Sequence, residues 1–189
     1  MPVELLPFIL YPLNFMTQPS NGKKYSLWLM PEGNVRDRLT LILHRLSVRH
    51  EAPEFPPHVT LLGSCMGERD EMIRQSSLVA ATLRPFTIRL GKLDFREEYF
   101  RCLFVHTGPA QPLRNAHQVA CRKFDRTPNP DFMPHLSLLY GNYALNVKED
   151  ARAELGRRLD VRFKVRSIHL YQTHRAVQNW RLVESFGLK

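Results

Sequence analysis

Two kinds of hydrophobic periodicity alternate along the chain and predict a mixed α and β fold. Apolar residues at helical spacing predict four helices, over Val35–Arg49, Glu68–Leu83, Pro112–Phe124 and Val147–Leu159. Short apolar runs predict strands over Tyr25–Met30, Phe86–Phe95, Tyr99–Thr107, Pro134–Tyr140, Val161–Thr173 and Trp180–Phe186. Arg96–Glu98 is the predicted turn of a hairpin, and two proline-rich loops, Glu51–Pro57 and Thr127–Asp131, end the helices that precede them.

Each proline-rich loop leads into a strand that begins with the same kind of motif. The first is His58-Val59-Thr60 and the second is His135-Leu136-Ser137, each directly after a proline and before two leucines. A helix, a proline loop and a motif strand therefore occur twice, as a duplicated half-domain would produce. The order of elements predicts an α+β protein with two related lobes, mostly antiparallel sheets and helices outside.

Strand geometry gives the motifs a chemical meaning. Residues i and i+2 of a strand point to the same face, so each motif places an imidazole beside a hydroxyl. If two such strands face one cleft, their side chains could catalyse in-line attack on a phosphate. One imidazole takes a proton and the other donates one, while Thr60 and Ser137 bind the phosphate oxygens. This chemistry needs no metal and no cofactor. A buried histidine bonded to a carbonyl would explain a single motif, but the repetition favours function.

Composition limits the classes of ligand. The 189 residues carry a formal net charge of +9, which favours anions such as nucleotides or RNA ends, although a basic surface kept for solubility is an alternative. No apolar run approaches the eighteen residues that indicate a membrane span, so we expect a soluble protein. The three cysteines show no metal-ligand spacing, and we expect small core residues in a reduced intracellular compartment, with a redox pair as the alternative.

Residues 1–22 are predicted to be an N-terminal extension outside a single bilobal domain over residues 23–189. The apolar stretch Leu5–Met16 contains Pro7 and Pro12, lacks the basic start of a secretory signal, and is too short to span a membrane. We expect this extension to pack on the body or to be partly disordered. Two of the remaining histidines, His44 and His117, fall on predicted helices, where a surface or boundary position is expected.

Several short blocks resemble the two-histidine (2H) phosphoesterases, in particular cyclic phosphodiesterases of the plant and yeast kind. The resemblance lies in Pro57–Thr60, Met133–Tyr140, the opening strand Tyr25–Trp28, and Trp180. It implies a bilobal fold with a pseudo-twofold axis and a water-filled cleft that holds both motifs. It also implies metal-independent hydrolysis of ADP-ribose 1″,2″-cyclic phosphate, a by-product of tRNA splicing, or of nucleoside 2′,3′-cyclic phosphates. By position, His135 would be the base for water and His58 the acid, with Thr60 and Ser137 on the phosphate.

Two aromatic residues match family positions that line the cleft, Trp28 and Tyr140. Strict alternation puts Leu139 on the face of His135, so Tyr140 reaches the site only if the strand twists or bulges before Gly141. An aromatic cap on the sheet edge is the alternative for Tyr140, and core packing is the alternative for Trp28.

The motif residues are also compatible with other functions. An RNA-end or 2′,5′-oligoadenylate phosphodiesterase of the same superfamily would favour a continuous basic groove with aromatic residues for stacking. The sequence shows no obvious basic cluster near either motif. A nucleotide-binding module without turnover would not need two titratable groups. We expect a monomer that acts on a small anionic nucleotide or on RNA ends, away from membranes, in the cytoplasm or nucleus.

Overall fold

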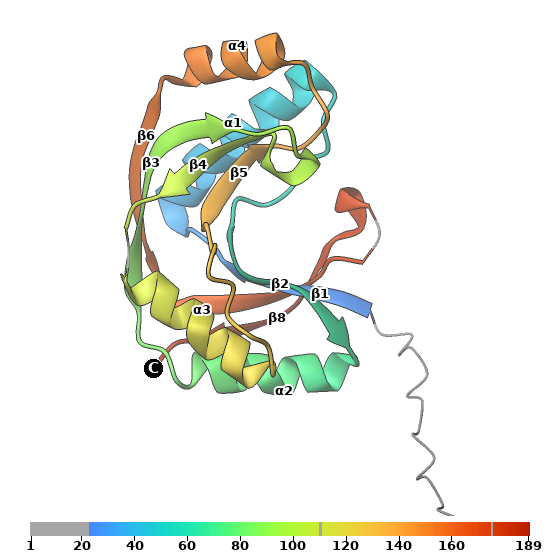
Figure 1. Ribbon diagram of the computed structural model, residues 1–189, viewed down its shortest axis with the longest axis vertical. Coiled ribbons are helices and arrows are strands. Elements are labelled where there is room, and N and C mark those ends of the chain that lie inside the picture. Colours follow the sequence, from blue (N-terminus) through green and yellow to red (C-terminus); the bar gives the residue numbers. More distant parts are fainter. Residues whose placement is uncertain (1–22, 110, 175) are drawn as a thin grey trace, which may run out of the picture.

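The computed structural model describes residues 23–109, 111–174 and 176–189, and the expected N-terminal extension lies outside them. The described residues form eight strands and four α-helices (Figure 1). In chain order they are β1 (Lys23–Leu29), α1 (Gly33–His50), β2 (Val59–Gly67), α2 (Arg69–Ala80), β3 (Phe86–Phe95), β4 (Leu103–Thr107), α3 (Gln111–Lys123), β5 (His135–Leu139), α4 (Leu145–Leu155), β6 (Arg158–Val165), β7 (Ser167–Gln172) and β8 (Arg181–Gly187). Two 3₁₀ turns, Tyr99–Arg101 and Val177–Asn179, precede β4 and β8.

The strands form one curled antiparallel sheet with the order β6-β3-β4-β5-β2-β1-β7-β8. Its two halves meet in the middle, where the two motif strands pair through Val59 and Leu136. The α+β class with antiparallel sheets is thus confirmed, and the two expected sheets are the halves of one continuous sheet. A pseudo-twofold axis between β2 and β5 relates β1 to β4, β7 to β3 and β8 to β6.

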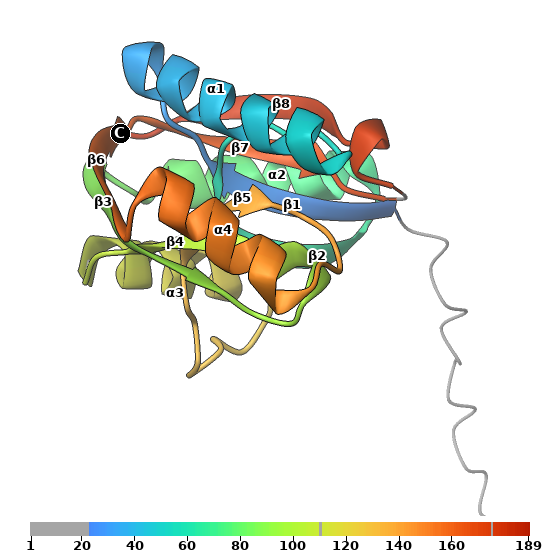
Figure 2. The same ribbon diagram turned by 90° about the horizontal axis from the view of Figure 1, so that it is seen from above.

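The helices exchange places between the halves. Helix α1 leads into β2 but packs on β5 and β6, whereas α3 leads into β5 but packs on β2. Helices α1 and α4 therefore cover one end of the molecule and α2 and α3 the other (Figure 1), and Figure 2 shows α1 and α4 side by side. Because each motif strand is buried under the helix of the other repeat, the two motifs are held in one rigid frame.

The apolar faces of the motif strands explain their burial. Val59, Leu61 and Leu136 are fully buried, and Leu138 is 1% exposed. In α1 the buried residues Leu39, Leu43 and Leu46 recur at helical spacing, which is the stripe predicted from the sequence. With one face anchored in this core, the opposite face of each strand is free to carry the histidine and the hydroxyl.

Three boundaries differ most from the prediction. The strand predicted over Val161–Thr173 is two strands, β6 and β7, which lie in opposite halves and are separated only by Arg166. The alternation of buried and exposed residues continues across Arg166, so periodicity alone shows no break. Helix α4 ends at Leu155 rather than Leu159, because Gly156 adopts a φ of +83°. The strand predicted from Tyr99 begins at Leu103, after a 3₁₀ turn.

No helix among the described residues is long and apolar enough to cross a membrane.

Candidate active site

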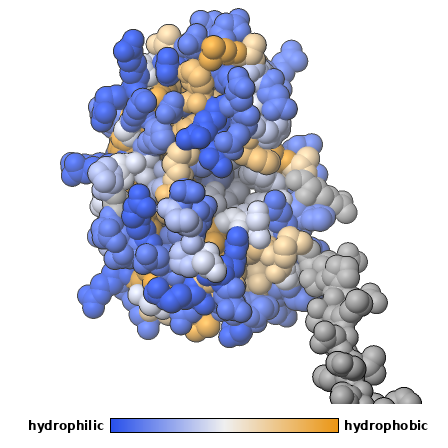
Figure 3. Space-filling view, viewed as in Figure 1, coloured by the Kyte–Doolittle hydropathy of each residue, from blue (hydrophilic) through white to orange (hydrophobic). Residues whose placement is uncertain are grey.

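A cleft of about 470 Å³ opens between the two halves of the sheet, and Figure 3 shows the hollow on that side of the molecule. Its volume lies within the range typical of small-molecule sites. Both motif histidines and both motif hydroxyls line it. The complete lining is Lys24, Ser26, Trp28, His58, Thr60, Gly63, Ser64, Phe100, Arg101, His135, Ser137, Tyr140, Thr173 and Trp180.

His58 lies deep in this cleft, with 5% of its surface exposed. Its Nδ1 donates a hydrogen bond of 2.7 Å to the carbonyl of Pro56, because a carbonyl can only accept. The neutral ring therefore keeps its lone pair on Nε2. Burial lowers the pKa of His58 to about 4, the Pro56 carbonyl opposes this change, and the charge of His135 lowers the pKa further. The two imidazoles are thus close enough to sense each other.

His135 repeats this arrangement in the other half. Its Nδ1 donates to the carbonyl of Met133 over 2.9 Å, again two residues upstream and again leaving Nε2 free. Burial lowers the pKa of His135, the Met133 carbonyl opposes this, and the positive charge of Arg101 adds to the lowering. At neutral pH and without a ligand, both imidazoles are therefore neutral, each with an unprotonated Nε2.

An aromatic ring on the neighbouring strand supports each imidazole. Trp28 stacks on His58 with ring centroids 3.6 Å apart, and it pairs with Thr60 across β1 and β2. Phe104 lies 5.1 Å from His135 and pairs with Ser137 across β4 and β5. The pseudo-twofold axis therefore relates both the histidines and their aromatic supports. Rings packed in this way fix the direction of each Nε2, which proton transfer requires.

The motif hydroxyls differ in what they contact. The Val59–Leu136 pair brings each motif histidine beside the hydroxyl of the other motif, because the strands are antiparallel. The Ser137 hydroxyl donates to the carbonyl of Phe100 over 2.9 Å, so its proton already has an acceptor. Within the described part of the chain, Thr60 has no hydrogen-bond partner for its hydroxyl. Thr60 is thus ready to donate to a phosphate oxygen, whereas Ser137 must first turn away from Phe100.

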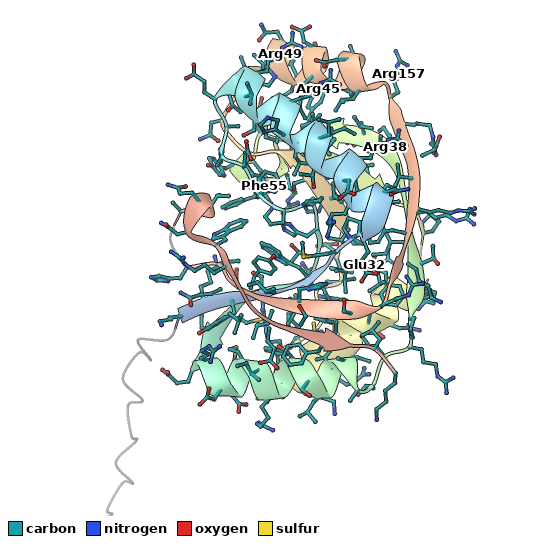
Figure 4. The ribbon with its side chains drawn as sticks, turned by 180° about the vertical axis from the view of Figure 1, so that it is seen from behind. Glu32, Arg38, Arg45, Arg49, Phe55 and Arg157 are labelled. Carbon is teal, nitrogen blue, oxygen red and sulfur yellow. The ribbon has the colours of Figure 1, made fainter. Side chains whose placement is uncertain are left out.

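Tyr140 and Trp28, predicted on the basis of resemblance, both face the cleft. Strand β5 ends at Leu139, and the chain turns at Gly141, where φ is +149°. Tyr140 therefore escapes the strict alternation of the strand and reaches the lining. Its ring stacks on Phe55 at 3.8 Å, and Figure 4 labels Phe55 in the loop between α1 and β2. Burial raises the pKa of Tyr140, so its hydroxyl stays protonated. Trp28 is 1% exposed, which makes it both a core residue and a support for His58.

The charge in the cleft is suited to an anion. Lys24 and Arg101 are the two cationic side chains in the lining, and among the described residues that line the cleft none is acidic. Arg101 is partly balanced by Glu98, 3.1 Å away. Positive groups next to neutral imidazoles attract a phosphate, and a bound phosphate would in turn favour protonation of an imidazole.

Several lining residues were missed by the sequence reasoning. Lys24 and Ser26 lie on the same face of β1 as Trp28, so strand alternation could have identified them. Phe100 and Arg101 were hidden because the 3₁₀ turn that carries them was predicted to be strand. The surface or boundary position expected for His117 is wrong: it is 6% exposed, and its Nδ1 donates to the carbonyl of Leu61 over 2.9 Å.

Within residues 23–109, 111–174 and 176–189, no group of three or more histidine, cysteine, aspartate or glutamate side chains is placed to hold a metal ion. Cys65, Cys102 and Cys121 are free and buried, as expected for small core residues.

The curled antiparallel sheet and the paired histidine motifs define a phosphoesterase of the two-histidine class. Residues 37–176 match the family model of the 2′-5′ RNA ligase superfamily. The chain belongs to this superfamily, and the prediction that it is an enzyme of the two-histidine phosphoesterase class is confirmed. The chain is also 25% identical over 128 residues to a cyclic phosphodiesterase of Arabidopsis thaliana, a match that covers 68% of this chain and 71% of the relative.

Solved structures share the fold at low sequence identity. Escherichia coli LigT, in complex with ATP, superposes with a TM-score of 0.62 at 14% identity, over 89% of this chain and 98% of LigT. Usb1 of Kluyveromyces marxianus gives a TM-score of 0.52 at 15% identity, over 90% of this chain and all of that protein (100%). These likenesses confirm the fold predicted from the duplicated motifs.

Proposed function

We propose that this protein hydrolyses cyclic phosphodiesters to phosphomonoesters without a metal ion, using His58 and His135 as its acid and base. The observation that carries the proposal is the pair of imidazoles in one cleft, each with Nδ1 tied to a carbonyl and Nε2 free. A site for binding alone would not need this arrangement. Each proton transfer in such a site contributes on the order of 10²- to 10⁴-fold in rate.

Binding of the anionic substrate leads one imidazole to take up the missing proton from solvent. Both imidazoles of the free protein are neutral at neutral pH, yet the reaction needs one neutral and one protonated ring. An anionic phosphate between them favours a proton on one Nε2, because the opposite charge raises the pKa of the ring. The neutral ring then takes the proton of the attacking water, while the protonated ring donates to the leaving ribose oxygen. The acid is thus loaded only when a phosphate is present.

The difference in burial between the two histidines favours one assignment of the base and the acid. His58 is the more deeply buried ring, with a pKa near 4, which favours its neutral form and the role of base. His135 is less buried, so we assign it the role of acid. This is the reverse of the assignment made by position from the resemblance.

The substrate we propose is a small nucleotide with a strained cyclic phosphate. The curated relative is named a cyclic phosphodiesterase, and solved LigT complexes contain ATP, 3′-AMP or phosphate. In this chain, Phe100 and Trp180 line the mouth with their rings 6.1 Å apart and 27° from parallel, a surface for stacking a base. Nucleoside 2′,3′-cyclic phosphates and ADP-ribose 1″,2″-cyclic phosphate, the by-product of tRNA splicing, both fit this chemistry. A monomer in the cytoplasm or nucleus remains our expectation.

The test is turnover of 2′,3′-cyclic nucleotides in the presence of EDTA. The proposal predicts that hydrolysis survives the chelator and that His58→Gln or His135→Gln lowers kcat at least ~10²-fold. The matched control is His44→Gln, because His44 is an exposed histidine on α1, paired with Glu54, and is not part of the cleft lining. Loss of activity in EDTA, or full activity in either motif variant, would refute the proposal. No turnover of any cyclic phosphate would favour a binding module instead.

A further inference from the structure

A cluster of exposed cations lies on strands β3 and β6, outside the cleft. Arg89 of β3 stands directly opposite Arg162 of β6, and Thr87 stands opposite Lys164 in the same ladder. Arg158 follows along β6, opposite Lys92. Like charges placed directly opposite each other destabilise a sheet. Their presence therefore calls for a reason other than stability.

This basic face is continuous with the face that carries His135. His106 of β4 pairs directly with His135, so the two side chains share one face of the sheet. Leu90 pairs with Thr107 and with Val161 on the buried face, which puts Arg89 and Arg162 on the same side as His106. His106 also lines a hollow of about 470 Å³ with Gly108, and Gly108 lines the next hollow, of about 400 Å³, with the arginines.

The cations are only partly neutralised. Arg158 pairs with Asp160 at 3.3 Å, and Lys92 pairs with Asp94 at 3.6 Å. Among the described residues no carboxylate forms an ion pair with Arg89, Arg162 or Lys164. Figure 3 shows hydrophilic side chains along the edge of the molecule where β3 and β6 lie in Figure 1. The net charge of +9 thus has a local concentration beside the active-site face.

Protection of a sheet edge does not explain the cluster. Lysines and arginines on an edge strand prevent pairing with other chains, and β6 is an edge strand. However, Arg89 lies on β3, which is paired on both sides. The opposite edge, β8, has exposed Leu182 and no comparable set of cations.

The distance between the cleft and the cluster selects the length of the ligand. Three strand spacings separate β5 from β6, which amounts to about 14 Å across the sheet. A single nucleotide held at His135 does not cross that distance, whereas an oligonucleotide does. Cations two residues apart on a strand suit successive phosphates of a single strand, which binds chiefly through its backbone charge.

We propose, building on the function proposed above, that Arg89, Arg162 and Lys164 bind the phosphate backbone of a single-stranded RNA whose cyclic-phosphate end lies in the cleft. The nucleotides upstream of that end would pass His106 and reach the cluster on β3 and β6. RNA ends would then be substrates of the same cleft beside free cyclic nucleotides. The sequence did not show this cluster, because residues 89–92 and 158–164 come together only in the sheet.

The experiment compares the double reversal Arg89→Glu/Arg162→Glu with the control Arg38→Glu/Arg122→Glu, which changes the net charge equally. Arg38 lies on the outer surface of α1 (Figure 4), and Arg122 is exposed on α3. Binding of a fluorescein-labelled 2′-O-methyl uridylate dodecamer is followed by anisotropy between 50 and 200 mM salt. The proposal predicts at least ~10-fold weaker binding for the test variant and a salt slope smaller by about 1.4, since two phosphate contacts are lost.

Turnover of 2′,3′-cyclic UMP separates this proposal from the function on which it rests. The test variant should hydrolyse the mononucleotide within about twofold of the wild-type rate, because the cleft is untouched. Equal loss of RNA binding in the control variant, or none in the test variant, would overturn the RNA proposal. So would binding to phosphatidylserine vesicles that exceeds binding to the RNA. Inactivity of the wild type on cyclic UMP, with RNA binding intact, would overturn the proposed function alone.

Discussion

Burial of His58 should leave a measurable signature in the acid stability of the protein. The folded pKa of this ring is about 4, against 6.5 for an ordinary histidine. The difference corresponds to about 3 kcal/mol, at about 1.4 kcal/mol per pKa unit. Because the unfolded chain binds this proton more readily, the unfolded state gains stability as pH falls through 6.5. The penalty is absent above pH 6.5 and complete below pH 4.

Replacement of His58 by Gln removes this titrating group, and with it its contribution to the pH dependence of the free energy of unfolding. Urea unfolding at pH 7, 5.5 and 4 should show that the wild type loses about 3 kcal/mol more free energy of unfolding over this range than His58→Gln does. Other titrating groups are common to both proteins and cancel in the comparison, apart from the interaction between His58 and His135. Parallel losses in the two proteins would show that His58 is not buried in a neutral state, and the reasoning on the cleft would be refuted.

Four further outcomes follow from the cleft. Sulfate, a phosphate mimic that does not titrate near neutral pH, should bind with uptake of about one proton, measured by calorimetry in buffers of different ionisation enthalpy, and no uptake would contradict loading of the acid by the ligand. With bis(4-nitrophenyl) phosphate, whose leaving group needs no acid, His135→Ala should keep more activity than His58→Ala, and the opposite order would restore the roles assigned by position. Thr60→Val should lower kcat/KM about tenfold or more. Ser137→Ala should lower kcat/KM less, because the backbone carbonyl of Phe100 already accepts the proton of the Ser137 hydroxyl, and equal losses would argue against this difference. Phe100→Ala should weaken nucleotide binding about tenfold with phosphate binding unchanged, and a parallel loss for phosphate would exclude base stacking.

Most of the structure that could be predicted from the sequence was predicted from the repeated motif. A histidine and a hydroxyl two residues apart, with leucines on the other face, predict a strand with one active face, and both β2 and β5 have that form. The helix before each motif strand was equally visible in its apolar spacing. What periodicity could not show was the exchange of α1 and α3 between the halves, because packing partners leave no local trace in the chain.

The rest of the site depends on irregular backbone and on strand register. Phe100 and Arg101 face the cleft because a 3₁₀ turn interrupts the predicted strand, and Tyr140 faces it because β5 ends one residue earlier. Phe104 supports His135 only through the β4–β5 ladder, which the sequence does not specify. The cations of β3 and β6 likewise become a cluster only through strand pairing, which places Arg89 opposite Arg162, 73 residues further along the chain.

The central claim is that a single phosphate binds between His58 and His135. Titration of the protein with inorganic phosphate, followed through the imidazole ring resonances by NMR, tests it most directly. The account predicts that both rings shift together along one saturation curve with one phosphate per chain, while exposed His44 stays unchanged. Separate curves for the two rings, or a response of only one of them, would contradict a shared site.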